Sequence, residues 1–222
     1  PRDSRFVFVA RHDHLGETRL DEVLAAAPGD PVIVAIEPHK LGPVHAVVAA
    51  AGAIDPDLPT VVNYCDFSFT WDAEHFLAWT QREEVDGAVV CYRDFHPHHR
   101  GAARYAYCRV DSWGRVQQVQ EKQAFTEDPR SEWASTGTYY FRSGALALQR
   151  HREHLRGDRT VNGEYYVSLV MDDMVRAADV VRVYAVDCFL QWGTPADLLD
   201  WRYWRRAFDD VAILERHRPG PP

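Results

Sequence analysis

The sequence predicts an α/β protein: a mixed, mostly parallel sheet flanked by helices, with one antiparallel hairpin. Up to residue 93, apolar runs alternate regularly with helical patterns, as they do in chains that build a sheet from strand–helix–strand units. The apolar runs are continuous, which is typical of parallel strands buried on both faces. After residue 100 the polarity alternates around a turn at 111–114, and this pattern predicts the hairpin.

In the first half of the chain, β-branched and aromatic runs predict strands, and one-sided apolar spacing predicts helices. Leu20, Val23 and Leu24 fall on one helical face, residues 42–43 open the next helix with Gly-Pro, and Asp72 is a suitable N-cap for the third. The expected strands are residues 5–10, 30–38, 59–64 and 86–93, and the expected helices are residues 18–27, 42–54 and 72–84.

In the second half, a strand enters a helix, a second helix follows, and a strand ends in a loop before a terminal helix. Pro195 suits the first turn of that last helix. The expected elements are the hairpin 104–122, the strand and helix of 135–151, the helix 165–178, the strand 180–195 and the helix 195–208.

The chain of 222 residues suits one domain, expected at residues 1–208, with a C-terminal tail at 209–222. Basic residues number 25 and acidic residues 33, and this net charge of −8 argues against a nucleic-acid-binding surface. The longest apolar run, 46–54, is far shorter than the roughly 20 residues of a membrane span. The four cysteines form no C-x-x-C pair and are expected to be reduced thiols. We expect a cytoplasmic protein that binds neither nucleic acid nor membrane.

One acidic side chain stands at the end of a predicted buried strand. The strand 59–64 is followed by Asp66, with Asn63 three positions earlier. In parallel sheets, ligands bind beyond the carboxyl ends of the strands, where a carboxylate can hold a divalent cation against phosphate oxygens. The alternative is that Asn63 and Asp66 only supply local hydrogen bonds to a turn.

Three further charged or rigid positions lie at the ends of predicted elements. Glu121 and Lys122 end the second strand of the hairpin, where a lysine either neutralises a phosphate or is solvated. Glu164 lies in a turn before a helix, where it either binds hydroxyl groups or is a first-turn acid favoured by the helix dipole. The Gly-Thr-Pro turn before the last helix either belongs to a functional site or is a structural turn in which Thr194 caps that helix.

Taken in order, these features resemble the sugar-phosphate nucleotidyltransferases. The resemblance rests on a strand ending N-x-x-D, a hairpin ending E-K, then "STGTYYF", "NGEYY" and a late "GTP-x-DL", and it extends from about residue 5 to about residue 204. It is strongest to the bacterial branch associated with capsule and surface polysaccharides. It implies a Rossmann-like three-layer fold of the GT-A-like type. It also implies transfer of a nucleotidyl group from a nucleoside triphosphate to a sugar 1-phosphate or similar acceptor, with release of pyrophosphate.

The resemblance also implies roles for individual residues. Asp66 and Lys122 would be the catalytic residues, with Asp66 binding Mg²⁺ and Lys122 holding the acceptor phosphate beside Glu121. Gly137 would let the acceptor approach the backbone, and Glu164 would bind its hydroxyl groups. The other positions assigned to substrate binding are Glu37, Gly42, Pro43, Asn63 and Tyr165, of which the first three match the segment against the nucleotide base.

The sequence departs from the family pattern at two places. The second metal carboxylate, two residues before the Gly-Thr-Pro turn, is replaced by Gln191, a neutral ligand, and Asp187 is an alternative on the same strand. The opening strand and glycine-rich triphosphate loop have no counterpart, because Pro1 begins where the family's second strand is expected. From this we expect a longer native chain, with these 222 residues inactive alone.

Two other functions remain open at this stage. A GT-A-type glycosyltransferase would share the fold, but its D-x-D metal motif is not matched by "NYCD". A non-catalytic domain that binds nucleotide sugars or regulates a partner is favoured by Gln191 and by the unmatched loop. The pattern assigns no nucleotide base, acceptor or oligomeric state.

Overall fold

The computed structural model describes residues 4–94, 96 and 105–216, and of residues 210–216 it describes the backbone alone. It has a mixed α/β architecture, as predicted. The main sheet holds β7 (Val116–Glu121), β6 (Ala106–Val110), β8 (Trp133–Phe141), β5 (Gly87–Tyr92) and β9 (Val181–Ala185) in that order, and β3 (Thr60–Asn63) also pairs with β8. Two small sheets pair β1 (Val7–Arg11) with β2 (Val32–Ile36), and β4 (Phe67–Phe69) with β10 (Phe189–Gln191).

The strand directions correct the expectation of a mostly parallel sheet. Among the described strands, β1–β2 and β5–β9 are the parallel pairs, and the other pairs are antiparallel. The strand–helix–strand unit from β3 to β5 exists as predicted, but its two strands are not neighbours. β8 lies between them and runs antiparallel to both. A strand inserted from a distant part of the chain leaves no mark on the local pattern of either neighbour.

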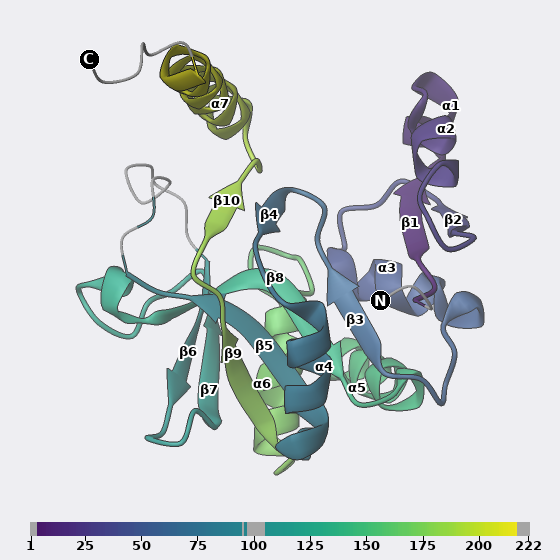
Figure 1. Ribbon diagram of the computed structural model, residues 1–222. Helices are drawn as coiled ribbons and strands as arrows, with labels where there is room; N and C mark the ends of the chain where they lie inside the picture. Colours follow the sequence, from purple (N-terminus) through teal and green to yellow (C-terminus); the bar gives the residue numbers. More distant parts are fainter. Residues whose placement is uncertain (1–3, 95, 97–104, 217–222) are drawn as a thin grey trace.

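Helices cover both faces of the main sheet (Figure 1). One face carries α4 (Ala73–Arg82), and the other carries α5 (Gly144–Gly157) and α6 (Val167–Arg176), with α3 (Pro43–Ala49) packed on α5. Two short helices, α1 (His12–Glu17) and α2 (Leu20–Ala25), follow β1, and 3₁₀ turns span Ala51–Ala53 and Pro129–Ser131. The predicted cap of α4 is confirmed, because Asp72 accepts a hydrogen bond from the His75 amide at 2.9 Å.

The core consists of two clusters separated by the sheet, and β5 contributes to both. Val89 and Cys91 face the α6 side with Met171, whereas Ala88 and Val90 face the α4 side with Phe76. All six residues of β5 are buried. This two-sided burial explains the continuous apolar run that the sequence shows there.

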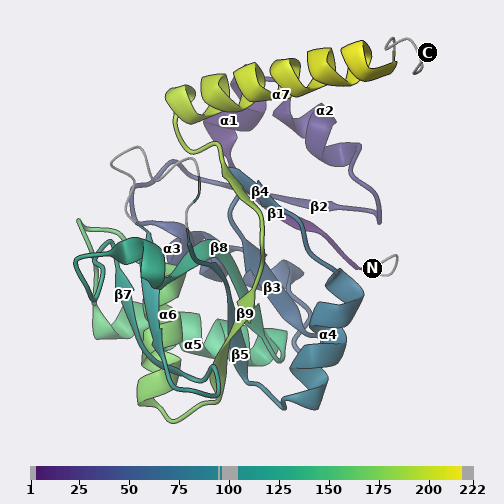
Figure 2. The ribbon, with the colours of Figure 1, turned by 60° about the vertical axis from the view of Figure 1, so that its left-hand side comes forward.

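The C-terminal part differs from the prediction in two respects. The expected strand 180–195 breaks after β9, and β10 leaves the main sheet to pair with β4. The terminal helix α7 (Pro195–Arg216) extends beyond residue 208, so the expected tail boundary falls inside a helix, and residues 217–222 lie outside the described residues. Figures 1 and 2 both show α7 and the α1–α2 segment beyond the same end of the main sheet. None of the helices that the structure describes combines the length and apolarity needed to cross a membrane.

Candidate functional site

The first half of the candidate site forms where β4 pairs with β10. Asp66 lies in the turn between β3 and β4, and the Trp192 amide donates to the Asp66 carbonyl oxygen at 2.7 Å. A Cβ atom added to Gly193 would lie 3.0 Å from the Asp66 Oδ2 atom and 3.8 Å from the Gln191 Nε2 atom. The strand pairing therefore brings Asp66 and Gln191 together from distant parts of the sequence.

The side chains of this half are suited to a hydrated cation. Asp66 is exposed, and its carboxylate forms no hydrogen bond or ion pair with the rest of the described chain. The Oε1 atom of Gln191 is buried, and the described residues offer it no hydrogen-bond partner. No cluster of three or more His, Cys, Asp or Glu side chains suitable for a metal occurs among residues 4–94, 96 and 105–216. The donor set matches Mg²⁺, which is usually held by one or two protein oxygens together with substrate phosphates.

The second half forms where β7 ends beside the start of α6. Lys122 donates from Nζ to the hydroxyl of Tyr166 and lies 4.5 Å from the centre of that ring, and the Tyr166 hydroxyl donates to Glu164. Burial raises the pKa of Tyr166, and its hydrogen bond to Glu164 raises it further. Lys122 itself has a φ of 57°, a left-handed conformation that is strained for a non-glycine residue. Lysine, tyrosine and glutamate thus form one hydrogen-bonded chain.

Glu121 lies beside this chain but is turned to a different partner. Its Oε2 atom accepts from the hydroxyl of Ser168 at 2.5 Å. Burial raises the pKa of Glu121, although the Ser168 hydrogen bond and the Lys122 charge lower it. Glu121 is therefore a half-buried acid whose carboxylate Ser168 holds against α6.

Tyr64 lies between the two halves of the site. Its hydroxyl accepts from the Val167 amide at the start of α6, at 3.4 Å. Burial raises its pKa, and the negative charges of Glu121 and Asp66 are both close enough to add to the effect. Tyr64 therefore connects the Asp66 turn to the Glu121–Lys122 strand end.

Two predicted positions, Asn63 and Gly137, shape the sheet beneath the site. Asn63 accepts from the Thr138 hydroxyl at 2.5 Å and donates to the Tyr64 carbonyl oxygen at 2.6 Å. Gly137 has a φ of 95° within a bulge of β8, and a Cβ there would lie 2.8 Å from the Phe67 ring and 3.0 Å from the Tyr64 ring. The bulge and these rings require glycine, so packing accounts for Gly137 and approach of an acceptor stays a prediction.

The segment expected against the base contacts the acceptor segment. Gly42 has a φ of 85°, and a Cβ there would lie 2.7 Å from the Tyr165 carbonyl oxygen. Pro43 is the first residue of α3. Glu37, whose side chain is 88% exposed, lies 3.8 Å from His12 and stands apart from this contact. Asp187, the alternative second ligand, is exposed in the break between β9 and β10.

Sequence reasoning missed several residues of the site. Tyr165, expected to bind substrate, donates to Asp158, and its neighbour Tyr166 is the residue that reaches Lys122. The spacing of residues at the start of a helix does not reveal which of two adjacent tyrosines faces the site. Tyr64 and Ser168 were also missed. The sequence shows Asp197 only as part of the late Gly-Thr-Pro pattern, yet it binds Gln191.

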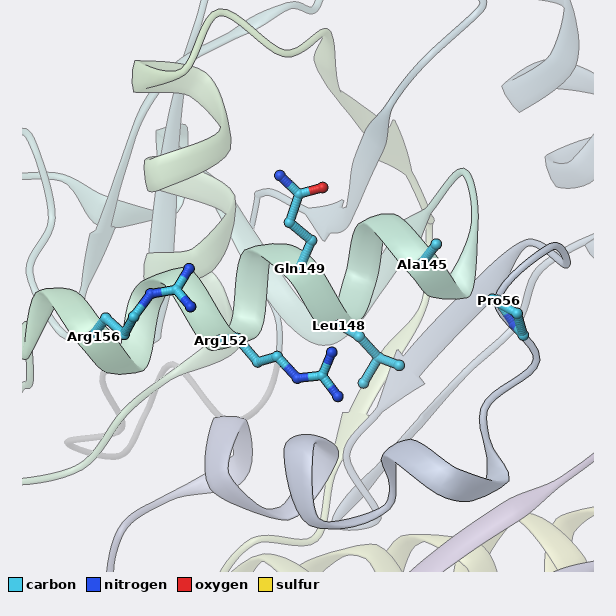
Figure 3. A pocket seen from close by; sticks show the side chains of 6 residues that line it. All are labelled: Pro56, Ala145, Leu148, Gln149, Arg152 and Arg156. Carbon is cyan, nitrogen blue, oxygen red and sulfur yellow. The ribbon is translucent and has the colours of Figure 1, made fainter.

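A separate cavity lies on the outer face of α5 (Figure 3). Its volume is about 380 Å³, and it is lined by Pro56, Ala145, Leu148, Gln149, Arg152 and Arg156. It shares no residue with the candidate site. The candidate site lies where β4 pairs with β10 and where β7 ends beside the start of α6.

Comparisons with known proteins agree with this geometry. Residues 8–204 match the family model described as "Nucleotidyl transferase". No curated protein matches the sequence. The fold is similar to a nucleoside-diphosphate-sugar pyrophosphorylase from Vibrio cholerae RC9 (TM-score 0.67, 17% identity, covering 89% of this chain and 80% of that chain).

Two further solved structures have the same fold. One is a putative glucose-1-phosphate thymidylyltransferase from Bacillus anthracis (TM-score 0.63, 14% identity, covering 97% of this chain and 78% of that chain). The other is an inositol-1-phosphate CTP transferase from T. maritima (TM-score 0.62, 13% identity, covering 87% and 71%). Since the family model spans most of its length, the chain belongs to the nucleotidyl transferase family.

Proposed function

We propose that this chain transfers a nucleotidyl group from a nucleoside triphosphate to a sugar 1-phosphate or a similar phosphorylated acceptor. An oxygen of the acceptor phosphate forms a bond to the α-phosphorus while the bond to the pyrophosphate oxygen breaks, and pyrophosphate leaves with the electron pair. The observation that carries the proposal is the position of Tyr64. It lies between a carboxylate, Asp66, that is suited to hold a cation, and the hydrogen-bonded chain of Lys122, Tyr166 and Glu164. A cation-binding group and the Lys122 ammonium group, both suited to phosphate oxygens, thus lie on either side of Tyr64.

The residues of the site act by position and charge. Transfer of a phosphoryl-type group depends mainly on aligning the reactants and stabilising charge on phosphate oxygens. The Lys122 ammonium group has two further N–H donors beyond the one on Tyr166, and these would bind the acceptor phosphate. Glu164 would release the Tyr166 hydroxyl and accept hydrogen bonds from hydroxyl groups of the acceptor instead. Asp66, with the oxygen of Gln191, would hold Mg²⁺, which neutralises charge on the phosphates when bound.

The biological setting is also a proposal. The sequence pattern that resembles the capsule and surface-polysaccharide branch favours the synthesis of a nucleotide-activated precursor. Cys91 and Cys108 are buried free thiols, and the Cys91 thiol donates to the Cys108 sulfur at 4.0 Å. Free thiols at this separation suit a reducing compartment, which favours the cytoplasm.

The first experiment is a thermal-shift series on the native chain with Mg²⁺ and each nucleoside triphosphate. A ligand at about 100 times its dissociation constant stabilises by about 2.7 kcal/mol, which raises the melting temperature of a domain of this size by roughly 5 to 10 °C. We expect one nucleotide to give this shift and Asp66→Ala to reduce it. A well-folded sample that responds to no nucleotide would contradict the proposal.

The second candidate function is a non-catalytic nucleotide-binding domain. It is favoured by Gln191, which replaces a metal carboxylate with a neutral amide. Exchange of labelled pyrophosphate into nucleoside triphosphate distinguishes the two functions, because only a catalyst makes and breaks the bond to the α-phosphorus. Binding without exchange would support the second candidate.

A further inference from the structure

One carboxylate, that of Asp197, organises the turn between β10 and α7. Its Oδ2 atom accepts from the Gln191 amide nitrogen at 2.8 Å, from the Thr194 amide at 2.9 Å and from the Thr194 hydroxyl at 2.7 Å. The Thr194 hydroxyl in turn accepts from the Asp197 amide at 3.2 Å. The bonds with Thr194 form a reciprocal cap at the start of α7. The bond from Gln191 has no part in that cap and needs a separate explanation.

The Gln191 bond fixes which end of the amide faces Asp197. An ionised carboxylate only accepts hydrogen bonds, whereas a carboxamide has a donating nitrogen and an accepting oxygen. The nitrogen must therefore face Asp197, and the oxygen must face away. That oxygen is buried, and nothing in the described part of the chain donates to it. A buried carbonyl oxygen without a donor is unfavourable unless a bound group completes it.

The Gln191 amide lies in the half of the site that contains Asp66. The Gln191 amide nitrogen and the Asp66 Oδ2 atom both lie within 4 Å of the position of a Cβ on Gly193. The amide oxygen is attached to the same carbon as that nitrogen. The two oxygen donors, one charged and one neutral, thus belong to one small region around the Gly193 turn.

We propose that Asp197 is a positioning residue that fixes the Gln191 amide so that its oxygen serves the cation held by Asp66. The inference rests on the proposed function, since it assumes that a divalent cation binds beside Asp66. The family is expected to have a carboxylate at this position, and both ends of a carboxylate are oxygens. A glutamine needs a partner such as Asp197, because its amide would otherwise present either the nitrogen or the oxygen to the cation. Asp197 removes that ambiguity.

The test removes the acceptor of this bond. In Asp197→Ala, the Gln191 amide nitrogen loses its carboxylate partner, so either end of the amide can face Asp66. The probe is Mn²⁺ alone, titrated into the native chain and followed by water-proton relaxation. We expect Asp197→Ala to weaken Mn²⁺ binding roughly 10- to 100-fold, which is typical when a residue that orients a metal ligand is changed. In the double variant Gln191→Glu/Asp197→Ala, both ends of the carboxylate at position 191 are oxygens, so the side chain presents an oxygen whichever way it turns, and the double variant is expected to recover the wild-type affinity or exceed it.

Two controls separate positioning from stability. Thr194→Ala removes the cap of α7 but leaves the Gln191–Asp197 bond, so it should lower the melting temperature and leave Mn²⁺ affinity unchanged. Asp66→Ala should abolish Mn²⁺ binding. Unchanged binding in Asp197→Ala, beside lost binding in Asp66→Ala, would overturn the role of Asp197 and leave the proposed function standing. If the wild type binds no Mn²⁺ through Asp66, the inference is overturned as well, and the nucleotide thermal shifts then decide the proposed function by themselves.

Discussion

At the scale of single residues, Lys122 and Glu121 are adjacent in sequence but differ in their surroundings. Lys122 is bound to the Tyr166 hydroxyl, and the half-buried Glu121 accepts from Ser168. Successive residues of a strand point to opposite sides, and the left-handed φ of Lys122 alters this alternation where β7 ends. The end of β7 thus places the Lys122 ammonium group beside Tyr166 and holds the Glu121 carboxyl group against α6.

We expect Tyr166→Phe to reduce kcat/KM for the acceptor roughly 10-fold, or about 1.4 kcal/mol, because the Lys122 ammonium loses the hydroxyl that positions it. The ring contact below the ammonium group remains. The measurement is pyrophosphate release at varied acceptor concentration. Tyr165→Phe is the matched control, since the Tyr165 hydroxyl is bound to Asp158. Equal losses in both variants would contradict a specific role for Tyr166.

The half-buried acid Glu121 gives a prediction about how stability depends on pH. Burial raises the pKa of Glu121, so its protonated form is favoured in the folded state. The stability contributed by that form is complete below the ordinary glutamate pKa and is lost as the pH rises through the folded-state pKa. Glu121→Gln should therefore flatten the fall in melting temperature above the ordinary glutamate range. A melting profile as steep as that of the wild type would contradict this cause.

At the scale of elements, the sequence predicted individual helices and strands better than it predicted which strands pair with one another. The hairpin, α4 with its Asp72 cap and the strand at β5 could be predicted, because apolar spacing and cap residues are local signals. The insertion of β8 between β3 and β5 could not, because strand neighbours depend on contacts between distant segments. The same limit applies to β10, whose partner β4 is a three-residue strand.

Helix α5 provides a prediction at this scale. His151 is fully buried on this helix, and burial lowers its pKa to about 4. Since a lowered histidine pKa favours the neutral form, its contribution to stability is present above the ordinary histidine pKa and is lost as the pH falls toward 4. The loss amounts to about 3 kcal/mol by pH 4. We expect His151→Leu to reduce this acid destabilisation in urea titrations, whereas His14→Gln, on an exposed residue, should not. If His151→Leu loses as much stability at low pH as the wild type does, the acid destabilisation comes from other groups.

At the scale of the whole molecule, the candidate site is built from four separate parts of the chain. Asp66 follows β3, Lys122 follows β7, Glu164 precedes α6, and Gln191 ends β10. Motif order along the sequence singled out these four positions, and their roles stay a prediction. It was not enough to find the residues that join them, because Tyr64, Tyr166 and Asp197 act through hydrogen bonds and burial. These connecting residues make the site dependent on the packing of the core beneath it.

The two core clusters should therefore differ in their effect on the site. Phe189 is 2% exposed, stacks on Tyr92 with ring centres 4.5 Å apart, and anchors the strand that carries Gln191. Met174 is equally buried in the cluster on the α6 side. We expect Phe189→Ala to cost about 3 to 5 kcal/mol and Met174→Ala about 2 to 5 kcal/mol in the free energy of unfolding, measured by urea titration.

Phe189→Ala and Met174→Ala should differ in the melting-temperature shift that ligand produces. Because Phe189 fixes β10 against β4, its loss should also reduce the melting-temperature shift produced by Mg²⁺ and the active nucleotide. Met174→Ala should keep that shift, since α6 contacts the site through its first turn and Met174 lies near its end. Equal ligand shifts in both variants would show that the β4–β10 pair holds its geometry without the aromatic core. The site would then be rigid through its hydrogen bonds alone, with Asp197 as the principal constraint on Gln191.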